Sequence, residues 1–308
     1  MSKKANRRIT GHGQYRLALS EWNRAALKKR NGQTVLLVHG YPDNRAVWDS
    51  VAKLLAQHFH VVSYDVRGAG QSDVPRKKRD YRLDVLRQDL LAVIKATSSD
   101  KPVHLVGHDW GSIQSWEAVT AADARNHIAS FTSISRPCLD HIGYRLRAEL
   151  GDRSLHGLTT AGLQVLRSWY VFAMQLPLLA PTVWRLGLDK QWPSLLKRLE
   201  SKDGLASVIS PSQRRDGIHG VNLYRANVMP RLLRPRERYT NVPVQLIVPT
   251  QDPFVGLDLY KGLDQWVTEL HRVDVAAGHW LPLSDPQTVA THVAEFISQT
   301  SAVQSKAA

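Results

Sequence analysis

An aspartate at a predicted strand-to-helix junction is the first indication of chemistry in this chain. Asp109 follows the apolar run Pro102–Val106 and precedes the helical stretch Ile113–Ala122, with Gly107 and Gly111 two residues away on either side. This spacing is typical of a sharp elbow that exposes a nucleophile, where glycine lets the backbone bend. A carboxylate in that position displaces a leaving group at saturated carbon and leaves an ester on the enzyme. The alternative, a simple helix cap, is less favoured because the glycine spacing and the strand are both present.

Two more polar residues follow predicted strands and could assist that nucleophile. Asp252 comes after the strand ending at Val248, and His279 comes after the strand ending near Val275. The carboxyl ends of parallel strands form one edge, where sites gather. A histidine there can activate water while an acid orients its ring. The competing residues lie on or near a predicted helix, or at the start of a strand: Asp258, Asp264 and His271.

The elements that must position these residues alternate along the chain. Apolar strand-like runs separated by amphipathic helices predict an α/β fold with a mostly parallel sheet flanked by helices. The expected strands are Tyr15–Trp22 (an antiparallel edge strand), Thr34–Val38, Phe59–Tyr64, Pro102–Val106, Ile128–Ile134, Val244–Val248 and Leu270–Val275. The expected helices are Val47–Ala56, Leu83–Thr97, Ile113–Ala122, Tyr260–Val267 and Pro286–Ser298, before a frayed tail over Ser298–Ala308.

One long segment interrupts this alternation. Residues 137–228 are helical in pattern, rich in tryptophan and tyrosine, and contain no strand-like run. We predict that this segment is an inserted helical cap over one end of the sheet. Residues 1–136 and 229–308 then form the core domain.

Composition narrows the class of protein and its partners. The net charge is +14, from 41 basic and 27 acidic residues, and part of it lies in short basic runs. No aromatic-basic recognition motif accompanies the runs, so we expect no nucleic-acid partner. Solubility is the favoured explanation, with weak attraction to an anionic membrane surface as the alternative. The single cysteine, Cys138, excludes an intrachain disulfide and, with no secretory signal, favours a cytoplasmic location, peripheral at the membrane under that alternative.

The order nucleophile, acid, histidine resembles that of α/β-hydrolase-fold epoxide hydrolases. The resemblance runs from the Thr34 strand to the Pro286 helix and includes the motifs His39–Pro42, Asp65–Ser72 and the Asp109 elbow. The chain is similar to the hydrolase half of bacterial proteins that fuse this domain to a short-chain dehydrogenase. The resemblance implies an α/β-hydrolase fold with a cap. Because the chain ends after the last helix, we expect no dehydrogenase activity.

The resemblance also implies roles for individual residues. The backbone N–H groups of Tyr41 and Trp110 would form an oxyanion hole, and Tyr170 and Tyr224 of the cap would donate to the epoxide oxygen. The predicted triad is Asp109, Asp252 and His279. Some relatives take the acid from an earlier strand, which makes Asp140 an alternative to Asp252. His39 and His108 are expected to have packing or supporting roles.

These residues predict an epoxide hydrolase that turns a hydrophobic epoxide into a vicinal diol through an alkyl ester on Asp109. The expected partners are the epoxide and water, with no metal or organic cofactor. A haloalkane dehalogenase is the nearest alternative, because it also uses an elbow aspartate followed by tryptophan, but the residue in the place of Tyr41 is usually asparagine there. A non-catalytic ligand-binding protein with the same fold is a second alternative; a complete triad argues against it.

Overall fold

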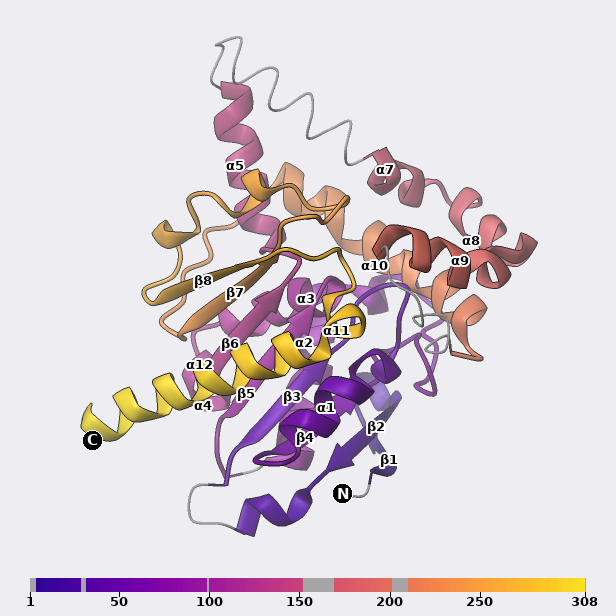
Figure 1. The fold of residues 1–308 in the computed structure, drawn as a ribbon. Helices are drawn as coiled ribbons and strands as arrows, with labels where there is room; N and C mark the ends of the chain where they lie inside the picture. Colours follow the sequence, from indigo (N-terminus) through magenta and orange to yellow (C-terminus); the bar gives the residue numbers. More distant parts are fainter. Residues whose placement is uncertain (1–3, 29–31, 99, 152–168, 201–209, 308) are drawn as a thin grey trace.

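An eight-stranded sheet forms the centre of the molecule in the computed structural model, which describes residues 4–28, 32–98, 100–151, 169–200 and 210–307 (Figure 1). The strand order is β1-β2-β4-β3-β5-β6-β7-β8. β1 and β2 pair antiparallel, as do β2 and β4, and every later pairing is parallel. The strands are β1 (Ala5–Thr10), β2 (Arg16–Trp22), β3 (Thr34–Val38), β4 (His60–Tyr64), β5 (Val103–His108), β6 (Ile128–Ile134), β7 (Val244–Pro249) and β8 (Leu270–Val275).

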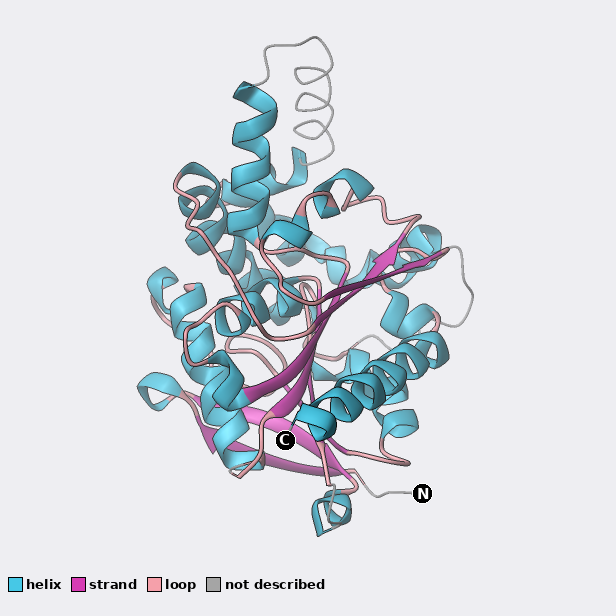
Figure 2. Ribbon diagram, turned by 90° about the vertical axis from the view of Figure 1, so that its left-hand side faces the viewer, coloured by secondary structure: helices cyan, strands magenta, loops and turns pink. Residues whose placement is uncertain are grey.

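Helices cover both faces of this sheet, so the residues of its central strands are almost all buried. In β3, Val35 and Leu37 pack into a core with α1 and α12, whereas Leu36 and Val38 pack into a second core with α2 and α3. Successive side chains of a strand point to opposite faces, so both faces need apolar residues. Figure 2 shows the twist of the sheet between these helices. The helices of the core are α1 (Asp49–Leu55), α2 (Leu83–Thr97), α3 (Trp110–Val119), α4 (Ala124–His127), α11 (Leu281–Ser284) and α12 (Pro286–Ala307).

The segment between β6 and β7 is mainly helical in its described residues. Its helices, which we call the cap helices, gather beyond one end of the sheet in Figure 1. The predicted cap boundary at residue 228 lies inside the last of them, so one continuous helix leads from the cap back toward the core. The cap helices are α5 (Leu139–Gly151), α7 (Trp169–Gln175), α8 (Leu179–Val183), α9 (Asp189–Glu200) and α10 (Gln213–Leu233).

A buried ion-pair network joins the first and last cap helices to the core. Asp140 of α5 and Glu117 of α3 both accept hydrogen bonds from Arg231 of α10, at 2.9 and 2.8 Å. Arg238 donates to the same two carboxylates, and Arg236 donates to Glu117. Each of these charges has an oppositely charged partner, as burial requires. The network therefore holds together the two points at which the chain enters and leaves the cap.

The N-terminal edge of the sheet differs from the prediction. The segment Arg16–Trp22 is antiparallel, as expected, but it is not the edge strand, because β1 pairs with it on the outer side. The side chains of β1 are exposed or half-buried and include Arg7 and Arg8. An outer strand is held largely by backbone hydrogen bonds to its neighbour, so it needs little apolar pattern. For that reason the sequence did not reveal it.

Two predicted features near the C-terminus were wrong. The segment Tyr260–Val267 forms only the short 3₁₀ turns η7 (Leu257–Tyr260) and η8 (Leu263–Gln265), separated by Gly262 at φ 70°. That left-handed residue cannot continue an α-helix. The expected frayed tail is instead the end of α12, which continues to Ala307; it contains neither glycine nor proline after Ser298. Neither α12 nor any other helix in the described part of the chain is both long and apolar enough to cross a membrane.

Candidate active site

The predicted nucleophile lies on a strained turn between β5 and α3. Asp109 has φ 49° and ψ −118°, a conformation that a residue with a side chain rarely adopts. The two flanking glycines are needed for close approach rather than for positive φ. A Cβ atom on Gly107 would lie 2.6 Å from the carbonyl oxygen of Gly111, and one on Gly111 would lie 2.0 Å from that of Val38. The elbow can therefore form only where these two residues lack side chains.

Both carboxylate oxygens of Asp109 have hydrogen-bond donors. The backbone N–H of Tyr41 donates to Oδ2 at 3.0 Å, and Nε of Arg136 donates to Oδ1 at 2.9 Å. The carboxylate is only 1% exposed. Burial by itself would raise the pKa of Asp109, but the charges of Arg136 and His279 and the Tyr41 N–H outweigh it and hold the pKa below its usual range. The side chain is therefore ionised at neutral pH, as a nucleophile must be.

His279 lies between the two predicted carboxylates. Its Nδ1 donates to Oδ2 of Asp252 at 2.6 Å, and its Nε2 is 3.8 Å from Oδ1 of Asp109. The backbone N–H groups of Phe254 and Val255 donate to the other oxygen of Asp252, at 2.8 and 3.1 Å, which fixes the orientation of that carboxylate. The structure thus brings together Asp109, Asp252 and His279, although Asp252 and His279 follow Asp109 by 143 and 170 positions in the chain.

These three side chains come from three separate loops, after β5, β7 and β8, that meet at the carboxyl ends of the strands. Burial by itself would lower the pKa of His279, but the neighbouring charges of Asp252 and Asp109 and the hydrogen bond that Nδ1 donates to Asp252 outweigh it, so the pKa is raised above its ordinary value. At 3.8 Å, Nε2 of His279 is too far from Asp109 for a hydrogen bond. The imidazole is thus close to the Asp109 carboxylate without being hydrogen-bonded to it.

The backbone of His279 is held in place by two side chains from neighbouring strand ends. Nε2 of His108 donates to the His279 carbonyl at 2.8 Å, and the Ser135 hydroxyl donates to the same oxygen at 3.2 Å. Burial lowers the pKa of His108 to about 4, so this ring is neutral, and it must carry its proton on Nε2 to donate to a carbonyl. His108 therefore has a supporting position.

The turn formed by His39, Gly40 and Tyr41 closes the other side of Asp109. A Cβ atom on Gly40 would lie 2.6 Å from Cβ of Asp109, so only glycine allows the turn to approach this closely. Nε2 of His39 accepts a hydrogen bond from the N–H of Val66 at 2.9 Å, so this histidine supports the turn structurally. The N–H of Tyr41 is thus a donor to this carboxylate, and Trp110 is the first residue of α3, where a backbone N–H has no acceptor within the helix.

The side chain of Tyr41 has a separate role, because it connects this turn to the cap. Its hydroxyl donates to the carbonyl of Gly217 in α10 at 3.0 Å and accepts from the indole N–H of Trp184 at 2.7 Å. Its ring also contacts the ring of Tyr224 edge to face, with centroids 5.4 Å apart. The residue that contacts Asp109 through its backbone therefore also anchors the cap through its side chain.

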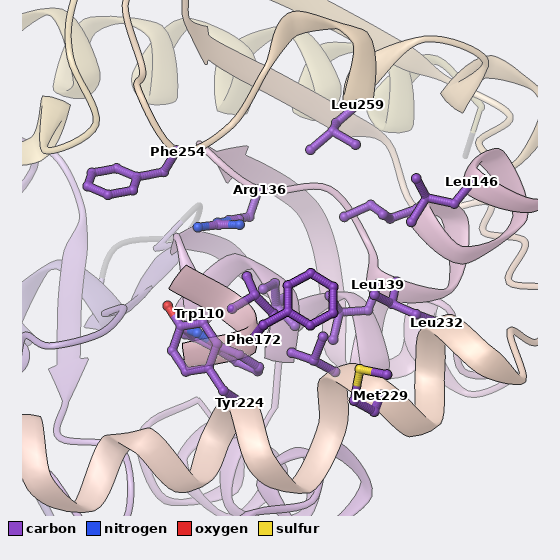
Figure 3. A pocket seen from close by; sticks show the side chains of 14 residues that line it. Trp110, Arg136, Leu139, Leu146, Phe172, Tyr224, Met229, Leu232, Phe254 and Leu259 are labelled. Carbon is purple, nitrogen blue, oxygen red and sulfur yellow. The ribbon is translucent and has the colours of Figure 1, made fainter. Parts of the chain in front are cut away.

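An apolar pocket lies beside Asp109, between the core and the cap. Figure 3 shows Tyr224 rising from α10 against Trp110, with Arg136 across the space from them. The rings of Tyr224 and Trp110 are 4.7 Å apart, and both side chains are buried. The side chains that line the pocket are Trp110, Ile113, Arg136, Leu139, Ile142, Leu146, Val171, Phe172, Tyr224, Val228, Met229, Leu232, Phe254 and Leu259.

The second predicted tyrosine cannot be placed in this pocket. Tyr170 belongs to α7, but its side chain lies outside the described residues. Its neighbours in that helix, Val171 and Phe172, line the pocket. Tyr170 therefore remains a prediction, whereas Tyr224 has a defined position.

The competing residues lie elsewhere. Asp140 is occupied by the ion pairs with Arg231 and Arg238. His271 is exposed on β8, with Nε2 3.2 Å from Glu269. The remaining two lie in the turns after β7, where Asp258 is half-buried and Asp264 is exposed. In the described structure it is Asp252 that contacts His279.

Sequence reasoning missed Arg136. This side chain is 9% exposed, contacts Asp109 and lines the pocket. It follows the end of β6 by two residues, so the rule that directed attention to strand ends could have found it. No motif pointed to it, because an arginine next to a proline is ordinary in a loop.

Comparisons with known proteins agree on the fold. A family model described as the alpha/beta hydrolase fold matches residues 33–161. A protein named "Probable oxidoreductase EphD" from Mycobacterium tuberculosis is 38% identical over 276 residues, which are 86% of this chain but 46% of that protein. The chain thus spans about half the length of this relative.

Epoxide hydrolases are also similar to the chain. Epoxide hydrolase 3 of Xenopus tropicalis is 28% identical over 285 residues, covering 88% of this chain and 72% of that protein. The crystal structure of epoxide hydrolase VrEH1 from Vigna radiata superimposes with a TM-score of 0.74 at 19% identity, covering 96% of this chain and 98% of that one. At this identity the structural likeness shows the shared fold.

Proposed function

Because the chain is an α/β-hydrolase-fold protein with epoxide hydrolases among its relatives, we propose that it hydrolyses a hydrophobic epoxide to a vicinal diol. The observation that carries the proposal is the buried Asp109 carboxylate on the elbow, close to the His279–Asp252 pair and beside an apolar pocket. The proposal concerns hydrolysis alone. The name of the Mycobacterium relative describes a protein of which this chain spans 46%, and the activities of its remaining part are not carried over.

In the first step, Asp109 attacks the less hindered carbon of the epoxide. The Tyr41 N–H holds Oδ2, so Oδ1, the oxygen that faces His279, forms the new bond to carbon. The carbon–oxygen bond of the ring breaks, and its oxygen takes a proton from a tyrosine. Tyr224 is positioned in the pocket for this, and Tyr170 is its proposed partner. The product is an alkyl ester on Asp109.

In the second step, water activated by His279 attacks the Cγ atom of that ester. Formation of the ester removes the negative charge of Asp109, which is one cause of the raised pKa of His279. The pKa of His279 therefore falls once the ester forms, and the imidazole can accept a proton from water. Asp252 stabilises the resulting cation. The N–H groups of Tyr41 and Trp110 stabilise the oxyanion at the former Oδ2, and the diol then leaves.

The lining of the pocket supports a hydrophobic substrate. Thirteen of the fourteen lining side chains are apolar or aromatic, and Arg136 is the exception. Apolar walls favour a substrate that loses little hydration on binding.

Product analysis tests this function. Purified protein is incubated with matched panels of aryl and alkyl epoxides and 1-haloalkanes, and diol and halide are measured. We expect diol formation that the Asp109→Ala substitution abolishes. Binding of the epoxides without any product would instead favour a ligand-binding protein and would contradict the proposal.

One observation favours a second candidate, a haloalkane dehalogenase. The indole N–H of Trp110 is buried, lines the pocket and has no hydrogen-bond partner among the described residues. A buried donor without a partner is costly, and a released halide could accept its hydrogen bond. Halide release without diol from the same panel would establish this candidate and would reduce Tyr224 to a packing residue.

A further inference from the structure

Arg136 is a buried cation whose position the proposed mechanism does not explain. Among the described residues that line the apolar pocket it is the one charged side chain, and its Nε donates to Oδ1 of Asp109 at 2.9 Å. A cation in contact with a carboxylate stabilises the ground state of that carboxylate and weakens it as a nucleophile. Arg136 therefore opposes the first step, so a benefit to the reaction must be sought in the second.

The loop that carries Arg136 holds its backbone firmly. Ser135, the residue before it, has φ 63°, in the left-handed region. The carbonyl oxygen of Arg136 accepts from the hydroxyl groups of Ser112 at 2.6 Å and Ser133 at 2.8 Å. The guanidinium thus reaches Asp109 from a loop attached to both β6 and α3. The guanidinium of Arg136 is therefore preorganised, unlike that of a flexible arginine on the surface.

The two oxygens of Asp109 have different surroundings. Oδ2 accepts the Tyr41 N–H, whereas Oδ1 accepts Arg136 and lies 3.8 Å from Nε2 of His279. If the proposed function holds, Oδ1 is the oxygen that bonds to the substrate. It is then also the oxygen that must leave Asp109 when the ester is hydrolysed. Arg136 is therefore placed at the leaving group of the second step.

We propose that Arg136 is a catalytic residue of ester hydrolysis, which stabilises the alkoxide as it leaves Asp109; this rests on the proposed function. In that step the bond from Cγ to the water oxygen forms, and the bond from Cγ to Oδ1 breaks. Oδ1 departs with the electron pair and takes the proton that His279 removed from water. The second proton of the water, left on the new carboxyl group of Asp109, returns to the tyrosine that protonated the epoxide oxygen, so both side chains regain their starting states. Arg136 keeps its own protons and donates a hydrogen bond only.

The hydrogen bond from Arg136 stabilises the leaving alkoxide more than the ester, because an ester oxygen is a weak acceptor and an alkoxide is a strong one. Such a difference between ground state and transition state is what accelerates a step. Removal of one preorganised donor to a developing oxyanion costs about 10²–10³ in rate. Arg136 also lowers the pKa of His279, which helps keep the imidazole neutral once Asp109 is esterified.

The test separates the two steps by following the covalent ester. Wild type and Arg136→Gln are mixed with styrene oxide, quenched at successive times and weighed intact by mass spectrometry. We expect Arg136→Gln to form the ester at least as fast as wild type and to hydrolyse it about 10²–10³ times more slowly. The ester, one styrene oxide heavier than the protein, then accumulates in the variant. Arg136→Lys, which keeps the charge, should restore part of the hydrolysis rate.

Two further variants keep this result interpretable. His279→Gln should trap the ester whatever Arg136 does, so its failure to do so with styrene oxide would overturn the proposed function and the role of Arg136 together. Arg87→Gln is the matched control, because Arg87 pairs with Asp123 on the core surface and should leave both rates unchanged. Only folded protein forms the ester, so the decay rate of the ester is measured on folded molecules even where a variant folds in part.

The role of Arg136 alone is overturned by either of two results. In one, His279→Gln traps the ester while Arg136→Gln hydrolyses it at the wild-type rate. In the other, Arg136→Gln forms the ester more slowly but hydrolyses it normally, which would make Arg136 a positioning residue for the nucleophile.

Discussion

Substitution of Tyr41 by phenylalanine should loosen the cap while leaving the proposed oxyanion hole intact. The hydroxyl of Tyr41 accepts the indole N–H of Trp184 and donates to the Gly217 carbonyl, and both partners belong to the cap. The backbone N–H of Tyr41, which donates to Asp109, is unaffected by the substitution. The two roles of this residue can therefore be separated.

The size of the effect follows from what each partner loses. Trp184 is buried, and its N–H would be left without an acceptor, which costs about 1–3 kcal/mol. Gly217 lies within α10, where its carbonyl is also an acceptor for the helix backbone, so the lost hydrogen bond there costs about 1 kcal/mol. We expect Tyr41→Phe to lower the free energy of unfolding by about 2–4 kcal/mol.

Urea unfolding, followed by tryptophan fluorescence and circular dichroism, measures this change. Tyr64→Phe is the matched control. Tyr64 is also buried, but its hydroxyl has no hydrogen-bond partner among the described residues, so its removal should be neutral or stabilising. If both variants unfold within about 0.5 kcal/mol of wild type, the contact to Trp184 does not hold the cap and the reasoning fails.

Three other substitutions test the site and its supports. Asp252→Asn removes the anion beside His279, so kcat should fall on the order of 10⁴-fold and the acid limb of the pH–rate profile should move to lower pH; an unshifted profile would contradict the pairing. Glu117→Gln leaves the buried arginines short of one charge and should cost about 3–5 kcal/mol in urea unfolding, whereas a loss under about 1 kcal/mol would contradict the network. Burial raises the pKa of Asp43 to about 7, so folding takes up a proton above pH 4 and wild-type stability falls as pH rises toward 7. Asp43→Asn should remove that loss, so the variant should gain stability relative to wild type between pH 4 and pH 8. Urea unfolding at both pH values measures this, and the same difference in unfolding free energy between variant and wild type at pH 4 and at pH 8 would refute the prediction.

The pattern of the central fold could be predicted because it repeats locally. In β3 four consecutive apolar residues follow Thr34, and the helix Leu83–Thr97 has helical spacing and the same bounds in the structure. Where the local signal was weak, prediction failed. β1 is polar and depends on its neighbour for hydrogen bonds, and Gly262 interrupts a stretch that otherwise has the composition of a helix.

The candidate site divides in the same way. Asp109, Asp252 and His279 each follow a recognisable strand, so their types and their order were visible in the sequence. Arg136 follows a strand as well, but nothing in its neighbours indicates that its guanidinium turns toward Asp109. That direction depends on the left-handed Ser135 and on hydroxyl groups donated by other elements.

By itself, the sequence determined the alternation of strands and helices, the glycines of the elbow and the three residues at strand ends, because each is set by neighbours a few positions away. Only the tertiary structure decided which oxygen of Asp109 faces His279, that Arg136 contacts the same oxygen, and that Tyr41 joins the turn to the cap. These contacts connect residues far apart in the chain. They depend on how side chains pack once the sheet and cap are assembled, and packing of that kind leaves no local pattern.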